Sequence, residues 1–178
     1  MTPPTAKRIP TGHASQSKPS VRPEVRQSAG PPDKHDAARH FGAAHAVTPG
    51  DLTETTDELT EKCGFDGVFE IVGRSSTIRQ AWDATRRGGT TVVVGAGAQD
   101  DHMRLSAGEL YLSDQRRVGS LYGSGNIRTE IARLLPLWRT SHLDLRGLIS
   151  RTITLDELRD AVAALEQGAA VRSLLTFS

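Results

Sequence analysis

One stretch decides the fold of this 178-residue chain: GFDGVFEIVGRSSTIRQAWDATRRGGTTVVVGAG, residues 64–97. It contains a short apolar run, Val68 to Val72, typical of a strand buried on both faces of a parallel sheet. Thr90 to Val94 is β-branched throughout and predicts a second buried strand. With a helix between them, the two strands form a right-handed parallel crossover. The sequence therefore predicts an α/β fold whose ligands bind at the glycine-bearing carboxyl ends of these strands.

The helix within this stretch is predicted from its apolar spacing. Ser75 or Ser76 can cap its first turn, and Gly88-Gly89 is the expected end. Four residues share one face and are expected to pack on the sheet: Ile78, Ala81, Trp82 and Thr85.

Composition excludes several classes of function. A formal net charge of +1 gives no electrostatic case for a nucleic-acid or membrane partner. No apolar run approaches the roughly 20 residues that span a bilayer, and residues 1–30 lack the apolar core of a secretory signal. The single cysteine, Cys63, excludes an internal disulfide and fits a reducing compartment, so we expect a cytoplasmic protein.

The composition divides the chain at about residue 35. Residues 1–35 hold seven of the nine prolines and few large aliphatic residues, so we expect a disordered, mildly basic tail. The rest alternates between helical and strand patterns. The expected elements are helices at 36–41, 51–62, 127–138 and 155–167, and strands at 45–47, 117–122, 148–153 and 172–177. Pro136 is expected to kink or break the third of these helices.

The Thr154 to Glu157 segment is a capping-box pattern that opens the last helix. That helix is expected to turn Leu158, Val162 and Leu165 inward and to end at Gly168.

Residues that could carry chemistry are few. No CxxC, HExxH or close His/Cys/Asp cluster is present, so a metal site made by this chain alone is not expected. Two glycine turns, Gly95 to Gly97 and Gly123 to Gly125, follow predicted strands, but neither completes the GxGxxG fingerprint. Each is either a tight exit turn or a backbone contact to a cofactor held elsewhere. Glu70 stands out because an ionised carboxylate within an apolar strand needs a partner.

Six segments, in this order, carry a resemblance to a known family. They are FGAAHAV (41–47), ELT followed by GFDGVFEIVGR (58–74), TIRQAWDATRRGGTTVVVGAG (77–97), GSLYGS (119–124), LISRTITLDEL (148–158) and VRSLLTF (171–177). Together they resemble the C-terminal part of the zinc-type alcohol dehydrogenases of the medium-chain dehydrogenase/reductase family. The resemblance implies a Rossmann domain, NAD(H) as cofactor, and oxidoreductase chemistry that interconverts alcohols with aldehydes or ketones.

The resemblance also implies a set of cofactor-binding residues. They are Val72, Gly73 and Arg74 on the adenosine side, Val94, Gly95 and Ala96 beside the nicotinamide, Ser120 and Tyr122 at its carboxamide, and Arg172 at the pyrophosphate. The strand from Arg117 to Tyr122 would pair with a second subunit to form a homo- or hetero-oligomer.

Several parts of the family pattern have no counterpart here. The catalytic domain with all its zinc ligands and the first βαβ unit with its GxGxxG turn are absent from the sequence. The resemblance thus implies a partial Rossmann domain at 36–147 and a strand-helix-strand at 148–178 that packs on the catalytic domain in the family. Losing the central strands would leave Phe65 to Val72 with a bare apolar edge and His45 to Val47 without a partner.

Three functions are considered for such a chain. The first is a dehydrogenase-family fragment that is inactive alone and binds NAD(H) weakly or not at all. The second is a non-catalytic dimerisation module that pairs with a full-length relative. The third, a nucleic-acid binder with a basic tail, is disfavoured by the near-neutral body.

Overall fold

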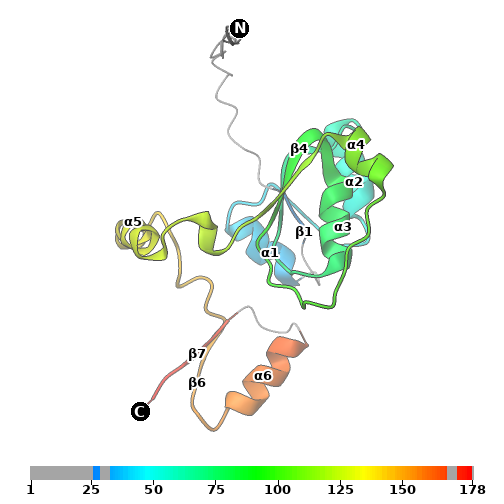
Figure 1. Ribbon diagram of the computed structural model, residues 1–178. Coiled ribbons are helices and arrows are strands. Elements are labelled where there is room, and N and C mark those ends of the chain that lie inside the picture. Colours follow the sequence, from blue (N-terminus) through cyan, green and yellow to red (C-terminus); the bar gives the residue numbers. More distant parts are fainter. Residues whose placement is uncertain (1–25, 29–32, 168–171, 178) are drawn as a thin grey trace, which may run out of the picture.

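The computed structural model describes residues 26–28, 33–167 and 172–177, which form helices alternating with short strands (Figure 1). The strands are β1 (Arg26–Ser28), β2 (His45–Val47), β3 (Phe65–Glu70), β4 (Thr85–Val93), β5 (Arg116–Gly119), β6 (Arg151–Ile153) and β7 (Ser173–Leu175). The helices are α1 (Asp33–His40), α2 (Leu52–Thr60), α3 (Ser75–Ala84), α4 (Ala107–Ser113), α5 (Ile127–Arg139) and α6 (Leu158–Glu166), with a 3₁₀ turn at Tyr122–Ser124.

The strands form three separate parallel sheets. The orders are β1-β2, β3-β4-β5 and β6-β7. In the central sheet Thr91 of β4 lies in register with Val68 of β3 and with Arg117 of β5. Parallel strands linked by helices confirm the predicted α/β class.

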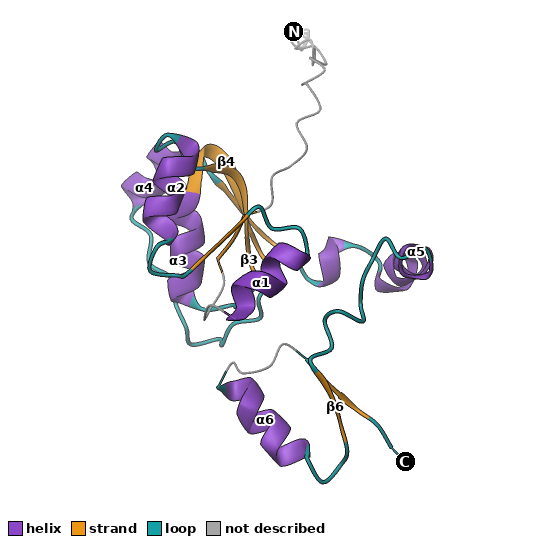
Figure 2. Ribbon diagram, turned by 180° about the vertical axis from the view of Figure 1, so that it is seen from behind, coloured by secondary structure: helices purple, strands orange, loops and turns teal. Residues whose placement is uncertain are grey.

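Helices lie on both sides of the strands. Figures 1 and 2 show α1 on one side and α2, α3 and α4 grouped on the other. The helix that follows β1 and the helices that follow β3 and β4 therefore cover opposite faces. This two-sided arrangement is the doubly wound, Rossmann-like pattern that the sequence predicts.

The C-terminal elements stand apart from this body. In both views α5 and the β6-α6-β7 unit project away from β3, β4 and β5. No residue of α5 is buried, and six of its large apolar side chains are each more than two-fifths exposed: Ile127, Ile131, Leu134, Leu135, Leu137 and Trp138. In the described parts of the chain, no helix has both the length and the apolar character needed to cross a membrane.

A cluster of buried residues lies where α3 covers β4. Ala81 and Trp82 are buried, with Trp82 only 4% exposed, as the helical spacing predicts. The hydroxyl of Thr85 lies 2.8 Å from that of Thr91, which is fully buried. This cluster therefore combines apolar burial with a satisfied polar pair.

The ends of α3 differ from the prediction. The N-cap is Arg74 and not Ser75 or Ser76, and the helix ends at Ala84, so Gly88 and Gly89 lie inside β4. The early end follows from Thr85, which takes an extended backbone while its hydroxyl donates to Ala81 O at 2.7 Å.

Gly89 lies at an irregularity in the pairing of β3 with β4. The β3–β4 register shifts between Phe65 and Gly67. A Cβ at Gly89 would lie 3.0 Å from Asp66 O and closer still to Thr85, so this position needs glycine for its close approach to the neighbouring strand.

The ordered part of the chain begins earlier than the composition suggests. Strand β1 and the start of α1 at Asp33 both fall within the range predicted as tail. Because β1 pairs with β2 from Arg26–His45 to Ser28–Val47, the expectation that 45–47 has no partner is wrong. Residues 1–25 and 29–32, for which disorder is predicted, lie outside the described residues.

Strand β3 does not have the two-sided burial expected of it. Phe69 is 70% exposed, and Ile71 and Val72, just beyond the strand, are 65% and 58% exposed. The reason is topological, since β3 is an edge strand of the three-stranded sheet. The expected bare apolar edge at 65–72 is therefore present.

Other expected elements are found with different bounds or burial. The strand expected at 117–122 ends at Gly119. Pro136 sits inside α5 without ending it, since the helix stops only at Arg139. Leu158, Val162 and Leu165 of α6, expected to point inward, are 40–56% exposed because the unit has no neighbour on that face among the described residues. The predicted stop at Gly168 lies outside them.

An ion pair joins α3 to α4. The Arg79 guanidinium lies 2.8 Å from Asp83 and 2.5 Å from Glu109. Glu109 also accepts from the Ser106 N–H in a capping box at the start of α4. The hydrogen bonds from Arg79 and Ser106 hold the pKa of Glu109 at about 2.

The two tryptophans of the chain provide a matched test of where the core lies. Trp82→Ala is expected to lower the free energy of unfolding by about 3–5 kcal/mol or to prevent folding, because a buried indole leaves a cavity. Trp138→Ala, which removes a side chain that is 42% exposed, is expected to cost less than about 1 kcal/mol. Urea denaturation followed by circular dichroism measures both. Equal losses would contradict this account of the core.

The ion pair predicts a specific acid sensitivity. Unfolded glutamate titrates near about 4.3, so between that value and the folded pKa of about 2 the unfolded chain binds more protons. The stabilisation from Glu109 is therefore complete above about pH 4 and is lost as the pH falls toward 2.

An NMR titration of the Glu109 carboxyl measures this directly. Arg79→Gln should move its midpoint upward, toward the ordinary glutamate value, whereas Arg87→Gln, at an exposed position of β4, should leave it in place. A wild-type midpoint near 4 would refute the assignment.

Candidate functional site

The carboxyl ends of β3, β4 and β5 meet at one edge of the central sheet. Backbone hydrogen bonds continue the pairing beyond the strands: Val94 N–H donates to Glu70 O at 2.7 Å, and Ser120 N–H donates to Val93 O at 2.8 Å. The segments 72–74, 94–96 and 120 therefore lie side by side. Seven of the nine predicted cofactor-binding residues are brought together here: Val72, Gly73, Arg74, Val94, Gly95, Ala96 and Ser120.

Glycines allow the first two of these segments to pack against each other. Gly73 has φ +83°, a conformation that side chains disfavour. A Cβ on Gly73 would lie 2.7–2.8 Å from the backbone of residues 95–97, and one on Gly95 would overlap the backbone of Gly73. Contact between the two turns is therefore enough by itself to require glycine at both positions.

A buried carboxylate holds the turn after β3. Glu70 is only 4% exposed. Its Oε1 accepts hydrogen bonds from Val72 N–H, Gly73 N–H and the Thr77 hydroxyl, each at 2.8 Å. Its Oε2 is buried with no hydrogen-bond partner among the described residues. Since neither oxygen faces solvent, Glu70 shapes the edge and is not placed to contact a ligand itself.

A second carboxylate anchors the helix that starts at this edge. Asp101 Oδ2 accepts from Ser75 N–H at 2.8 Å, which satisfies a free donor at the N-terminus of α3. Hydrogen bonds from Ser75 lower the pKa of Asp101. Sequence reasoning missed this contact because the two residues are 26 positions apart.

The other two predicted residues are placed differently. Tyr122 lies in the 3₁₀ turn beyond β5 and is 71% exposed. Arg172 lies at the β6-β7 sheet, where its carbonyl accepts from Ser150 N–H at 2.8 Å. The β6-β7 sheet lies apart from β3, β4 and β5 (Figure 1), so Arg172 is not brought together with the other predicted residues.

Two apolar side chains of this edge are exposed. Val72 and Val94 are 58% and 46% exposed. A hollow between α3 and β5 is lined by Ile78, Val93, Asp101, His102, Met103, Arg117 and Gly119, and includes none of the predicted residues.

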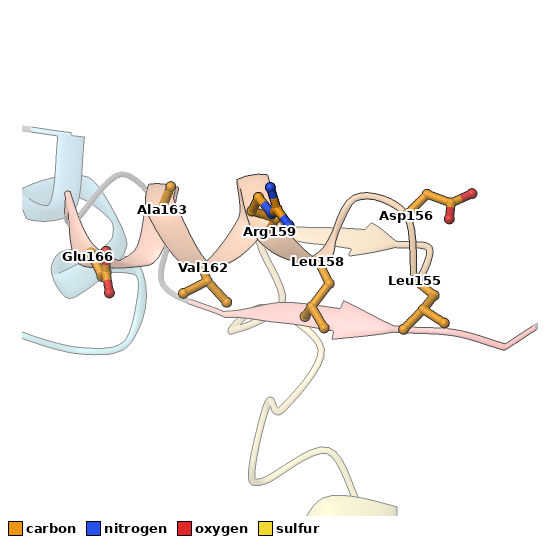
Figure 3. A pocket seen from close by; sticks show the side chains of 7 residues that line it. All are labelled: Leu155, Asp156, Leu158, Arg159, Val162, Ala163 and Glu166. Carbon is orange, nitrogen blue, oxygen red and sulfur yellow. The ribbon is translucent and has the colours of Figure 1, made fainter.

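A second hollow lies along α6. In Figure 3 the side chains of Leu155, Leu158 and Val162 point to the same side of this unit. The lining of this hollow also includes three charged residues, Asp156, Arg159 and Glu166.

The described residues do not fit a zinc site. They contain no group of three His, Cys, Asp or Glu side chains that could hold a metal ion. Cys63 is exposed, and its thiol lies 3.7 Å from Glu61 O. The metal that the fold family implies therefore has no ligand set in the described part of this chain.

Comparison with known proteins identifies the family of this chain. The profile of the family described as zinc-binding dehydrogenase matches residues 24–139, about two thirds of the chain. The match begins at residue 24 and so includes β1, within the range predicted as tail.

Curated relatives include S-(hydroxymethyl)glutathione dehydrogenases from Escherichia coli O139:H28 and Shigella sonnei. Each is 25% identical over 150 residues, which cover 82% of this chain and 40% of the relative. The chain thus spans about two fifths of the length of these relatives.

Solved structures share the fold. Benzyl alcohol dehydrogenase from Acinetobacter calcoaceticus superposes with a TM-score of 0.78 at 20% identity, over 88% of this chain and 43% of its own. Alcohol dehydrogenase from Aeropyrum pernix gives 0.73 at 25% identity, over 84% and 42%. A zinc-binding dehydrogenase from Sinorhizobium meliloti, solved with NADP, gives 0.71 at 22% identity, over 87% and 45%.

The family match, the order of the parallel strands and the helices on both faces agree with the resemblance seen in the sequence to the C-terminal part of zinc-type alcohol dehydrogenases. This chain belongs to the zinc-binding dehydrogenase family.

Proposed function

We propose that this chain provides the nicotinamide-side half of a dinucleotide-binding domain, and that alone it neither oxidises alcohols nor holds NAD(H) tightly. The observation that carries the proposal is the open carboxyl edge of β3, β4 and β5. Ligands of doubly wound sheets bind outside this edge, and seven predicted contact residues lie along it.

Each segment of the edge has a part in this proposal. The exposed side chains of Val72 and Val94 offer apolar surface to a planar ring and exclude water from one side of it. The backbone at 94–96 and at Ser120 offers polar groups to a carboxamide. Glu70 acts indirectly, because its three hydrogen bonds fix the turn that presents Val72.

The missing interactions are those that hold the phosphates. The glycine turns of this chain do not complete a GxGxxG fingerprint, and the turn at 95–97 is closed by contact with Gly73. Arg172, the predicted pyrophosphate contact, lies on a separate sheet. A dinucleotide would therefore be held at one end only.

We infer the reaction class, hydride transfer, from the family, and we assign no substrate to this chain. When a complete member binds the cofactor, the nicotinamide supplies or accepts a hydride. The relatives named above differ in their alcohols, S-(hydroxymethyl)glutathione in one and benzyl alcohol in another. Since they share this fold, we place substrate choice outside the region represented by this chain.

A second candidate function is a dimerisation module. Strand β5 pairs with β4 on one side and is an edge strand of its sheet. Val118 is 46% exposed, and Leu121 and Tyr122 just beyond the strand are 79% and 71% exposed. An apolar edge of this kind supports pairing with the same strand of a full-length relative, which co-purification would detect.

Calorimetric titration with NADH tests the main proposal. We expect binding at least about 100-fold weaker than to a complete dehydrogenase such as the Escherichia coli relative, a deficit of about 3 kcal/mol or more. Comparable affinity for the two proteins would overturn the proposal.

A pair of variants tests whether the residual binding uses the proposed edge. Val94→Asp should abolish it, because a charge would replace the apolar surface beside the ring. Val162→Asp on α6 is the matched control, since both valines are 46% exposed. Equal effects of the two substitutions would show that the edge is not the site.

A further inference from the structure

A turn in the linker between α5 and β6 docks on the end of α1. Asp144 Oδ2 lies 3.7 Å from His40 Nε2. Beside this pair, Gly147 lies so close to Phe41 that a Cβ on the glycine would be 3.1 Å from the tip of the Phe41 ring. An ionic contact and a close backbone-to-ring contact therefore join the N-terminal and C-terminal thirds of the chain.

The linker that carries this turn is held by its own hydrogen bonds. Helix α5 ends in a Schellman-type cap, in which His142 N–H donates to Leu137 O at 2.9 Å and Ser141 takes a left-handed backbone with φ +59°. Asp144 Oδ1 then accepts a hydrogen bond from Gly147 N–H at 2.9 Å. Because these turns are hydrogen-bonded, the place where the linker docks fixes how α5 and the β6-α6-β7 unit lie on either side of it.

The α1 side of the contact is also well defined. His40 is the last residue of α1, and its ring meets the Phe41 ring edge to face, with the centroids 5.1 Å apart. Asp36, one turn earlier on α1, pairs with Arg39 at 3.2 Å. The carboxylate that faces the His40 imidazole from the linker is therefore that of Asp144, while the two charged neighbours on α1 pair with each other.

The attraction between the two sides depends on the charge of the imidazole. A separation of 3.7 Å is too long for a hydrogen bond, so the attraction is coulombic. The hydrogen bond from Gly147 N–H, helped by His40 beside it, lowers the pKa of Asp144, so this carboxylate is ionised at neutral pH. Imidazole gains its proton near about pH 6.5. The contact is therefore attractive below this pH and loses its attraction above it.

Few buried side chains place the elements beyond the linker. No residue of α5 is buried, and α6 buries only Ala161. Both elements project away from β3, β4 and β5 (Figures 1 and 2). The His40 and Asp144 side chains are 68% and 51% exposed, so solvent screens their attraction, and the pair can shift an equilibrium by no more than about fivefold.

We propose that the turn from Asp144 to Gly147 and the corner formed by His40 and Phe41 are a pH-dependent latch, which sets where α5 and the β6-α6-β7 unit lie relative to the central sheet. The docked form binds the imidazole proton more tightly than the undocked form, so acid favours docking. The inference does not depend on cofactor binding, and Arg172, beside β7, belongs to the part that the latch positions.

Pulsed electron paramagnetic resonance on the full chain tests the latch. Glu58→Cys on α2 and Asp160→Cys on α6 place spin labels at exposed positions, and Cys63→Ser removes the native thiol. Between about pH 8 and about pH 5.5, the ratio of docked to undocked distances should rise by about two- to fivefold. Identical distance distributions at the two pH values would overturn the proposal.

Charge-removing variants locate the response. His40→Gln removes the titrating group, and Asp144→Asn removes the negative charge but keeps an oxygen that can accept from Gly147 N–H. Each should abolish the pH response. His102→Gln, at an exposed position after β4, is the matched control and should respond as the wild type does. A response that survives both of the first two substitutions, or that the control abolishes, would refute the latch.

The contact between Gly147 and Phe41 has a separate test. In Gly147→Ala the added Cβ would press on the Phe41 ring, so the docked population should fall at both pH values. Because Gly147 lies at an exposed position of the linker, circular dichroism should show the fold unchanged. A docked population equal to that of the wild type would show that the turn does not dock on Phe41 and would contradict the proposal.

Discussion

The constraint on which this structure depends is that a parallel sheet needs pairing on its edges and cover on both faces. Strand β4 pairs with β3 and β5 on its two edges and lies under α3 on one face. Strand β3 meets it only in part, and its residues Phe69 and Ile71 stay exposed in consequence. On the side away from β4, strand β3 has no paired strand among the described residues.

The same constraint explains the functional edge. Its shape comes from the backbone: two turns pack through Gly73 and Gly95, and the buried carboxylate of Glu70 fixes the first of them. These interactions are local to β3, β4 and α3, so the described residues themselves contain the contacts that shape the edge. What the edge lacks is a neighbour, since the position next to β3 is where a doubly wound fold places its phosphate-binding strand.

Local features could be predicted from the sequence, and features that depend on distant parts could not. Ala81 and Trp82 are buried as predicted, because helical spacing alone decides which face meets the sheet. Phe69 is apolar and lies in an apolar run, which predicts burial, but it is 70% exposed in an edge strand. The cap on Ser75 comes from Asp101, which no local pattern links to it. Strand β1 could not be predicted because the prolines on either side of it dominate the composition of residues 1–35.

Residue-resolved amide hydrogen exchange of the chain alone tests the central claim that the sheet is open beside β3. We predict slow exchange along β4, around the fully buried Thr91. In β3 only the amides that donate toward β4 should be protected, while those that point away should exchange within about tenfold of unstructured peptides. Slow exchange of all the amides of Phe65–Glu70 would show that this edge is paired and would contradict the account.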